Sequence, residues 1–191
     1  MIKIAVVAET NAAREFLERR VGGILKNIGI VRALTEPELS RHHFDLIVVH
    51  HLGGRIRELQ AKFKRTPVAA VDLSLLPIGV KAIMTIIRQH DTIAVVAEHQ
   101  SCANKLLSEV IEAGIVNCKF VSGIFRDISE LKADRYITSE EMSDGIPDFL
   151  KNDPRMVVVP RMINQESSVK LIQLALEIAT RNRGVDAIVS I

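Results

Sequence analysis

The sequence has few cysteines and no long apolar run. Cys102 and Cys118 are the only cysteines among 191 residues. No signal-peptide pattern is present, nor is any unbroken apolar run of about 18 residues, the length a membrane-spanning helix needs. We therefore expect neither a disulfide framework nor a membrane span, and a cytoplasmic location. A chain of this length buries roughly 70% of its unfolded surface, so stability requires no metal or disulfide.

An excess of one sign of charge is also missing. The chain has 25 Lys and Arg against 23 Asp and Glu, a net charge of +2, and the two signs are interspersed rather than grouped in blocks. No hydrophilic linker, low-complexity run or helix-turn-helix pattern is present. The sequence therefore indicates no direct binding to nucleic acid.

An internal repeat is the most informative feature that the sequence does contain. The hexapeptide IAVVAE begins at Ile4 and again at Ile93, an offset of 89 residues. Convergence of two buried strands on one simple string is the alternative explanation. Further identities at the same offset favour duplication instead, and these are Leu17 with Leu106, Val21 with Val110, Asp45 with Asp134, Lys62 with Lys151, Val68 with Val157, Lys81 with Lys170, and Ile83 with Ile172.

Each half alternates strand and helix patterns. In the first half, short apolar runs predict strands at residues 2–8, 28–34, 46–49 and 67–71, with helices at 12–21, 55–63 and 78–89. Gly22 and Gly23 are expected to end the first helix. Thr35 and Glu38 form a capping-box pattern that predicts a short helix before the third strand.

The second half follows the same plan. Strands are predicted at residues 92–97, 118–122, 135–138 and 156–159, and helices at 101–113, 127–132 and 165–180. Ser139 has the chemistry of a helix N-cap, but Met142 stands where a capping box needs Glu or Gln, so a weak helix is expected there. Residues 185–191 are predicted to form one more strand.

These patterns predict an α/β fold of two pseudo-symmetric Rossmann-like lobes, each a parallel sheet flanked by helices. Lobe one comprises residues 1–76 plus 182–191, and lobe two comprises residues 77–181. The second lobe includes crossover helices at 77–90 and 165–181. We expect a ligand cleft between the lobes, because ligands of parallel α/β sheets bind at the carboxyl ends of the strands.

Polar residues follow the predicted strands at those carboxyl ends, and we expect them to bind the ligand. In lobe one these candidates are Glu9, Thr10, Asn11, His50, His51, Gly53, Gly54, Asp72 and Ser74. In lobe two they are Glu98, His99, Ser101, Ser139 and Arg161.

Each candidate also has a purely structural interpretation. His50 and His51 either contact a ligand, bind a metal, or cap a strand. Donors for a metal would come from neighbouring strand ends, but no close H-x-H or H-x-x-x-H spacing supports one, and we expect no metal. The Gly53–Gly54 pair either offers free amides to a carboxylate or phosphate, or forms a tight turn.

The remaining candidates leave similar alternatives. Arg161 either forms a bidentate pair with an acidic ligand or pairs with Asp72, its counterpart in the repeat. Ser74, Ser101 and the Thr10–Asn11 pair either donate to the ligand or cap helices. The apolar helices at 78–89 and 169–179 either form a homodimer or pack on their own sheets.

Several short motifs resemble the receptor domain at the amino terminus of bacterial propionate-catabolism-type activators, which has a periplasmic-binding-protein-like fold. The resemblance is carried by Asp45-Leu46-Ile47-Val48-Val49, Gly53-Gly54, Ile56-Arg57-Glu58, Pro67-Val68, Ser74 and Thr92-Ile93-Ala94-Val95-Val96. It implies a non-enzymatic sensor without a cofactor. Its small-molecule ligand closes the lobes and shifts an equilibrium read by an output domain or partner protein outside this chain.

The two-lobed plan is also similar to that of the aspartate/glutamate racemase superfamily. That resemblance implies two acid/base groups, usually cysteines, on opposite faces of the substrate carbon. The matching strand ends carry His50-His51 and Ser139-Glu140, with no cysteine at either. We therefore expect no catalytic residue and predict an effector-binding domain of a transcription regulator for an anionic metabolite. A racemase or isomerase with non-cysteine acid/base groups is the alternative.

Overall fold

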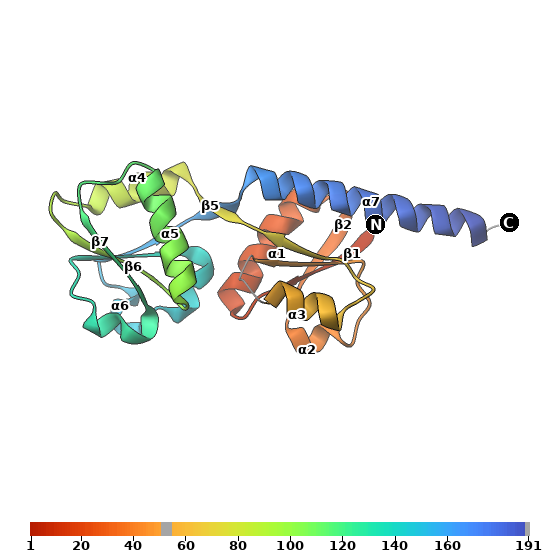
Figure 1. Cartoon of the computed structure of the whole chain (residues 1–191), viewed down its shortest axis with the longest axis horizontal. Helices are drawn as coiled ribbons and strands as arrows, with labels where there is room; N and C mark the ends of the chain where they lie inside the picture. Colours follow the sequence, from red (N-terminus) through yellow and green to blue (C-terminus); the bar gives the residue numbers. More distant parts are fainter. Residues whose placement is uncertain (51–54, 190–191) are drawn as a thin grey trace. The chain divides into compact units, whose positions relative to one another are not determined.

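The computed structural model describes residues 1–50 and 55–189 of the chain, with side chains for residues 1–50 and 56–182. The chain divides into two compact units. Unit 1 contains Met1–Leu73 and Ile163–Ile191, and unit 2 contains Ser74–Met162. The chain passes between the units in β5 (Leu73–Leu75) and in β10 (Arg161–Ile163), and these two short strands pair with each other. Each unit is a four-stranded parallel sheet. Figure 1 shows the helices that flank the sheets.

Unit 1 is built on β1 (Ile2–Val7), β2 (Gly29–Leu34), β3 (Leu46–His50) and β4 (Val68–Val71), in the order β2-β1-β3-β4. Successive side chains of a strand point to opposite faces of its sheet. Ile4 and Val6 of β1 belong to one buried cluster, whereas Ala5 and Val7 belong to the other. Burial on both faces explains why the strands read as continuous apolar runs.

Helices cover both faces of this sheet. On one face, α1 (Asn11–Leu25) and α7 (Gln165–Val189) pack against the strands through apolar residues such as Leu17 and Leu171. On the other face lie α2 (Glu36–Leu39) and α3 (Arg55–Lys62), as Figure 1 shows. They contribute Leu39 and Leu59 to the second buried cluster. The capping box that opens α2 is confirmed, because Glu38 Oε2 accepts hydrogen bonds of 2.7 Å from both the backbone N–H and the hydroxyl of Thr35.

Unit 2 is built on β6 (Thr92–Ala97), β7 (Lys119–Ile124), β8 (Arg135–Ser139) and β9 (Met156–Val159), in the order β7-β6-β8-β9. Its α-helices are α4 (Pro77–Ile86), α5 (Gln100–Glu112) and α6 (Asp148–Lys151). Two 3₁₀ helices, η1 (Phe125–Glu130) and η2 (Glu140–Gly145), stand where short α-helices are expected from the sequence. One apolar cluster joins β6 to α4 and α5.

The two sheets have the same strand order and equivalent registers. Ile4 lies opposite Val31 and Leu46, and Ile93 lies opposite Phe120 and Arg135, so the 89-residue offset is kept across three strands. The fourth strand departs from this offset by one residue. In unit 1, Val68 lies opposite Ile47. In unit 2, Val157, the counterpart of Val68, lies opposite Ile137 and not opposite Tyr136, the counterpart of Ile47.

An aspartate before the third strand makes the same contacts in both units. Asp45 accepts a 2.7 Å hydrogen bond from the backbone N–H of Lys3, and its own N–H donates to the Lys3 carbonyl at 2.8 Å. Asp134 and Thr92 exchange the same two bonds, both at 2.8 Å. Each aspartate thus fixes the start of its unit's first strand.

Two expectations about helix ends are wrong. Helix α1 continues through Gly22 and Gly23 to Leu25, because the fully buried Leu25 side chain stabilises the last turn against the low helix propensity of glycine. The strand expected at 185–191 is helical as far as Val189, as the last part of α7. A seven-residue apolar pattern does not distinguish a strand from the continuation of a helix.

The boundary of the second lobe also differs from the structure. The sequence places residues 165–181 in lobe two, whereas α7 belongs to unit 1, where it packs on β1 and β4 and buries Leu171, Ala175 and Ile178. Helix α4 belongs to unit 2, as expected. Among residues 1–50 and 55–189, no helix combines the length and the apolar composition needed to cross a bilayer.

Candidate functional site

The strand order of each unit defines one place where a ligand is expected. In unit 1 the chain runs from β1 outward to β2 and returns to β3 on the other side of β1, so the connections diverge between the carboxyl ends of β1 and β3. The same divergence occurs between β6 and β8 in unit 2. Ligands of open parallel sheets bind at such switch points. We call these two places the unit 1 edge and the unit 2 edge.

The unit 1 edge carries four of the described candidate residues. Glu9, Thr10 and Asn11 follow β1, and His50 ends β3. Thr10 is the N-cap of α1, since its Oγ1 accepts a 3.2 Å hydrogen bond from the N–H of Ala13. Its capping interpretation is therefore confirmed. Glu9 is exposed and His50 is half-buried.

Arg14 ties the segment after β1 to the first turn of α1. Its Nη1 donates to the carbonyls of Ala8 and Glu9, both at 3.1 Å, and its Nη2 donates to Asn11 Oδ1. The backbone beside Glu9 is therefore held in place. The candidates His51, Gly53 and Gly54 lie outside the described residues.

The unit 2 edge begins with Glu98 and His99 after β6. His99 is the N-cap residue of α5 and is exposed, but its side chain makes no capping hydrogen bond. Glu98 is half-buried. Ser101 is exposed in the first turn of α5. These side chains stand next to the end of the central strand.

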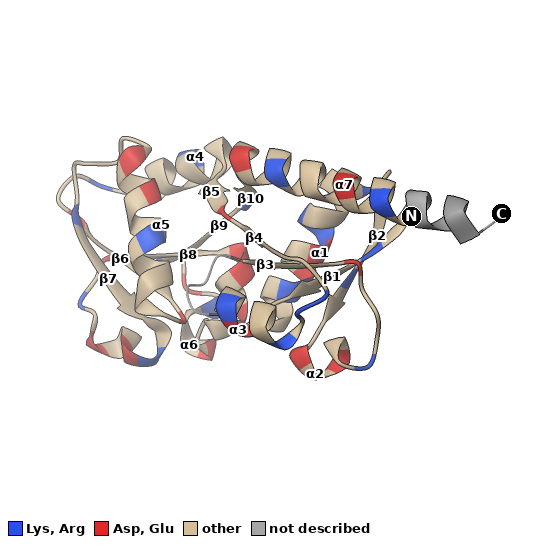
Figure 2. Cartoon of the chain, turned by 45° about the vertical axis from the view of Figure 1, so that its right-hand side comes forward, with Lys and Arg blue, Asp and Glu red and all other residues tan. Residues whose placement is uncertain are grey.

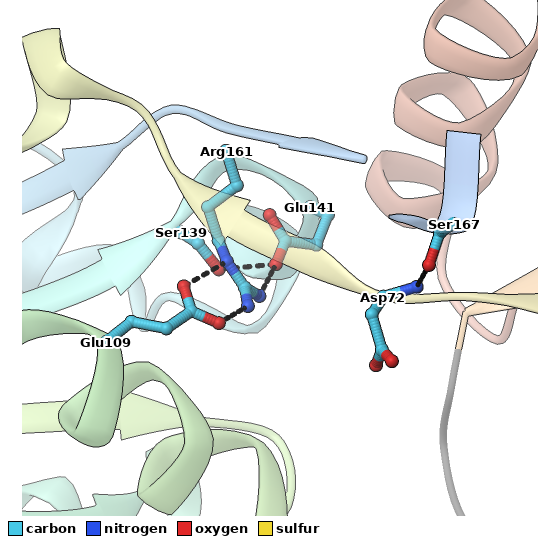
Figure 3. Close-up of polar contacts among 6 residues, drawn as sticks. All are labelled: Asp72, Glu109, Ser139, Glu141, Arg161 and Ser167. Atoms are coloured by element: carbon cyan, nitrogen blue, oxygen red, sulfur yellow. Dashed lines mark hydrogen bonds and ion pairs between the residues drawn. The ribbon is translucent and has the colours of Figure 1, made fainter. Parts of the chain in front are cut away.

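The other half of the unit 2 edge leads into a buried ion cluster, shown in Figure 3. Arg161 is only 1% exposed and lies between the carboxylates of Glu109, on α5, and Glu141, on η2. Its Nη1 donates to Glu141 Oε1 at 2.7 Å, its Nε donates to Glu109 Oε2 at 3.1 Å, and its Nη2 donates to Glu109 Oε1. We call Arg161, Glu109, Glu141 and Ser139 the Arg161 cluster.

Ser139 completes the cluster from the end of β8. Its hydroxyl donates a 2.7 Å hydrogen bond to Glu141 Oε1, and the residue is fully buried. It does not act as a side-chain cap for η2. Within the described part of the chain, the buried Oε2 of Glu141 has no hydrogen-bond partner. Ser139 and Arg161, both candidates from the sequence, are thus brought together through a carboxylate that sequence reasoning missed.

The electrostatics of the cluster follow from its composition, two carboxylates around one guanidinium. Burial lowers the pKa of Arg161, but Glu141 and Glu109 outweigh it and leave that pKa raised. Burial raises the pKa of Glu109, although Arg161 opposes the change. The cluster therefore sets two carboxyl groups around one permanent cation.

Neither thiol has the properties of an activated cysteine. Burial raises the pKa of Cys102, on α5, and nearby Glu141 and Glu98 act in the same direction. Burial also raises the pKa of Cys118, with Asp91 adding to the effect. A reactive or proton-transferring cysteine needs a lowered pKa in an electropositive site. Both thiols stay protonated at neutral pH.

The last two candidates lie at the connection between β4 and α4. The Asp72 N–H donates to Ser167 Oγ at 3.0 Å, as Figure 3 shows. The Asp72 carbonyl accepts from the N–H of Asn164 at 2.9 Å. Its backbone therefore anchors the start of α7 within unit 1. Ser74 lies in β5 and is half-buried.

Sequence reasoning missed Glu109 and Glu141 for different reasons. Glu109 follows the buried Leu106 by three residues on α5. Helical periodicity therefore could have predicted that Glu109 lies near the buried face of this helix. Glu141 lies in a 3₁₀ helix whose sequence has no such pattern. Its burial could not be inferred from neighbouring residues.

By its fold and its two edges, the chain is an α/β protein with two parallel-sheet units, each with polar residues at its switch point. No protein-family model matches the chain, and neither a curated protein nor a solved structure is significantly similar to it. The resemblance to receptor domains therefore remains a prediction.

Proposed function

We propose that this chain is an effector-binding domain that senses a small metabolite for a bacterial transcription regulator. One observation carries the proposal, namely that two sheets with the same strand order and equivalent registers each place polar side chains at their switch point. Binding at such strand ends needs side chains and amides but no catalytic group. The equivalent registers, and the equivalent hydrogen bonds made by Asp45 and Asp134, also support an origin of the two units by duplication.

Binding without turnover is supported by the state of the two thiols and of the Ser139 hydroxyl. A racemase-like reaction needs a proton donor and acceptor on opposite faces of one carbon. The pKa values of Cys102 and Cys118 are raised by burial, and the Ser139 hydroxyl already donates to Glu141. These groups are poorly suited to proton transfer, so we place the racemase-like activity second.

The charges at the edges bear on the ligand's chemistry. We propose a ligand with a carboxylate or phosphate, as expected from the sequence. The Arg161 guanidinium already binds the carboxylates of Glu109 and Glu141, so it is not available to the carboxylate or phosphate of the ligand. Glu98, at the unit 2 edge, complements an ammonium group on the same ligand. An amino acid carries both groups and is therefore the first class to test.

The experiment is a thermal-shift survey of amino acids, organic acids and phosphate esters, followed by an NMR assay of any stabilising compound for turnover. A ligand that binds only the folded state raises the melting temperature. We expect stabilisation without conversion. Conversion of the compound would replace this proposal with the racemase-like one, and no stabilisation by any compound would reject both.

Each edge is then tested with its own variant. For unit 1 we choose Glu9→Gln, with Glu112→Gln as a matched exposed control. For unit 2 we choose His99→Asn, with His90→Asn as control, because His90 is exposed and Asn tolerates its positive φ of 74°. Affinity should fall about tenfold in the edge variants, the effect of losing one interaction worth roughly 1.4 kcal/mol. Unchanged affinity in both edge variants would contradict binding at the edges.

A further inference from the structure

Unit 1 has a pocket that is lined by basic and apolar side chains. Its volume is about 230 Å³. Its lining consists of Lys3, Ile30, Arg32, Leu34, His42, His43 and Phe44. None of these residues belongs to the candidate site. We call this the β2 pocket.

The sequence pattern of β2 explains where the pocket lies. Ile30, Arg32 and Leu34 alternate along this outer strand, so their side chains point to one face of the sheet. Lys3 lies opposite Ile30 in the register and shares that face. Residues 42–44, which connect α2 to β3, close the pocket from the side.

The two permanent charges in the lining, Lys3 and Arg32, are both positive. Lys3, Arg32, His42 and His43 are exposed, and the lining includes no acid. The described part of the chain shows no ion pair for any of the four. The adjacent Asp45 is engaged elsewhere, since its carboxylate accepts from the Lys3 backbone N–H and from Asn182.

This arrangement differs from the charge pattern of α5 and α7. Figure 2 shows Lys and Arg interspersed with Asp and Glu along α5 and α7. A group of basic side chains with no acid among them is therefore a local feature, and it surrounds a hollow rather than a convex surface. Cations gathered without partners repel one another, and a bound anion removes that repulsion.

Unit 2 has no equivalent of the β2 pocket among its described residues, because the Leu131 side chain fills the corresponding space over β7. At an offset of 89 residues, Lys3, Arg32 and His42 correspond to Thr92, Val121 and Leu131. Leu34 corresponds to Gly123, where an added Cβ would lie 2.6 Å from the Leu131 side chain. Leu131 thus occupies the space over β7. The pocket and its charge are properties of unit 1 and do not follow from the fold.

We propose that the β2 pocket binds a small phosphate-bearing anion. Lys3 and Arg32 supply two permanent positive charges, which match a phosphate dianion, and Arg adds a planar fork of donors. His42 and His43 supply further ring N–H donors. Phe44, Ile30 and Leu34 form an apolar wall beside these groups. The site is independent of the effector-binding function proposed for the edges.

The test is an NMR titration of the full chain with inorganic phosphate and pyrophosphate at constant ionic strength. We expect saturable shifts of the His42 and His43 ring signals and of the amides of residues 30–34. Arg32→Gln should weaken binding about tenfold or more, as expected for loss of a charge-assisted pair. Arg126→Gln is the matched control, because the Arg126 side chain is 84% exposed in unit 2.

Two results would overturn the proposal. One is the absence of saturable shifts at residues 42–44 with either anion. The other is equal affinity of the Arg32→Gln and Arg126→Gln variants, which would indicate nonspecific screening. Lys3→Gln provides a second variant with the same expected direction if Arg32→Gln fails to fold.

Discussion

The two units share a strand order but differ in where they place charge. Unit 2 buries Arg161 with two carboxylates, whereas Asp72, the counterpart of Arg161 in unit 1, anchors α7 through its backbone. Unit 1 instead leaves a basic pocket over β2 where unit 2 places Leu131. The apolar strands are thus common to both units, while the polar groups around them are specific to each. Shared residues specify the fold, and the residues that differ indicate function.

The largest difference between the units predicts the largest effect of mutation. Arg161→Met leaves Glu109 and Glu141 buried without their cation, and removing one partner of a buried ion pair costs about 3–5 kcal/mol. Urea unfolding should show this loss of stability. Arg126→Met is the control and should change stability by less than about 0.5 kcal/mol, because the Arg126 side chain is 84% exposed. A loss below about 1 kcal/mol for Arg161→Met would show that the cluster is dispensable.

The second prediction tests the similarity of the units. Asp45→Ala and Asp134→Ala each remove a carboxylate that accepts from the backbone N–H of the first strand. Each should cost about 1.5–3 kcal/mol, as expected for a hydrogen bond to a charged group. Asp45 also accepts from Asn182, so its loss should be the larger one. If urea unfolding finds one variant neutral and the other strongly destabilised, the two contacts are not equivalent.

The sequence predicted the regular part of the fold well, and its limits have physical causes. The eight strands of the two sheets were all found, because strands buried on both faces are continuous apolar runs. The three-residue strands β5 and β10 were missed, since such segments are too short for a pattern. The end of α1 was misplaced because glycine propensity was overridden by the burial of Leu25.

The candidate site was predicted less completely. The edges could be proposed from the order of strands, since polar residues at strand ends are visible in the sequence. The partners of Arg161 could not, because Glu109 and Glu141 lie 52 and 20 residues from it in the chain. The β2 pocket was also not foreseen, because it depends on the register of β1 with β2 and on the position of residues 42–44.

A smaller effect is expected where unit 1 has glycines in a helix. Gly22 and Gly23 stand within α1, whereas the equivalent positions of α5 are Ile111 and Glu112. An added Cβ at either glycine meets no atom within 4 Å. Gly22→Ala should therefore stabilise the protein by about 0.5–1 kcal/mol in urea unfolding. Gly29→Ala is the contrasting variant and should destabilise it, because its Cβ would lie 2.8 Å from the Ile2 carbonyl oxygen.

The last prediction concerns the pH dependence of the Arg161 cluster. The pKa of Glu109 is raised in the folded state, mainly by burial. The folded protein therefore binds this proton more tightly than the unfolded chain, so the stabilisation is complete below the unfolded pKa and is lost as pH rises through the folded pKa. Glu109→Gln should flatten that part of the stability profile. Glu112→Gln, an exposed change on the same helix, should leave the profile unchanged.

The most direct test of the effector-binding proposal maps amide shifts across both units when a stabilising compound from the survey is added. Binding at the edges predicts the largest shifts at residues 8–11 of unit 1 and at residues 98–101 and 138–141 of unit 2, with the compound recovered unchanged. Shifts confined to other parts of the units, or conversion of the compound, would contradict the proposal.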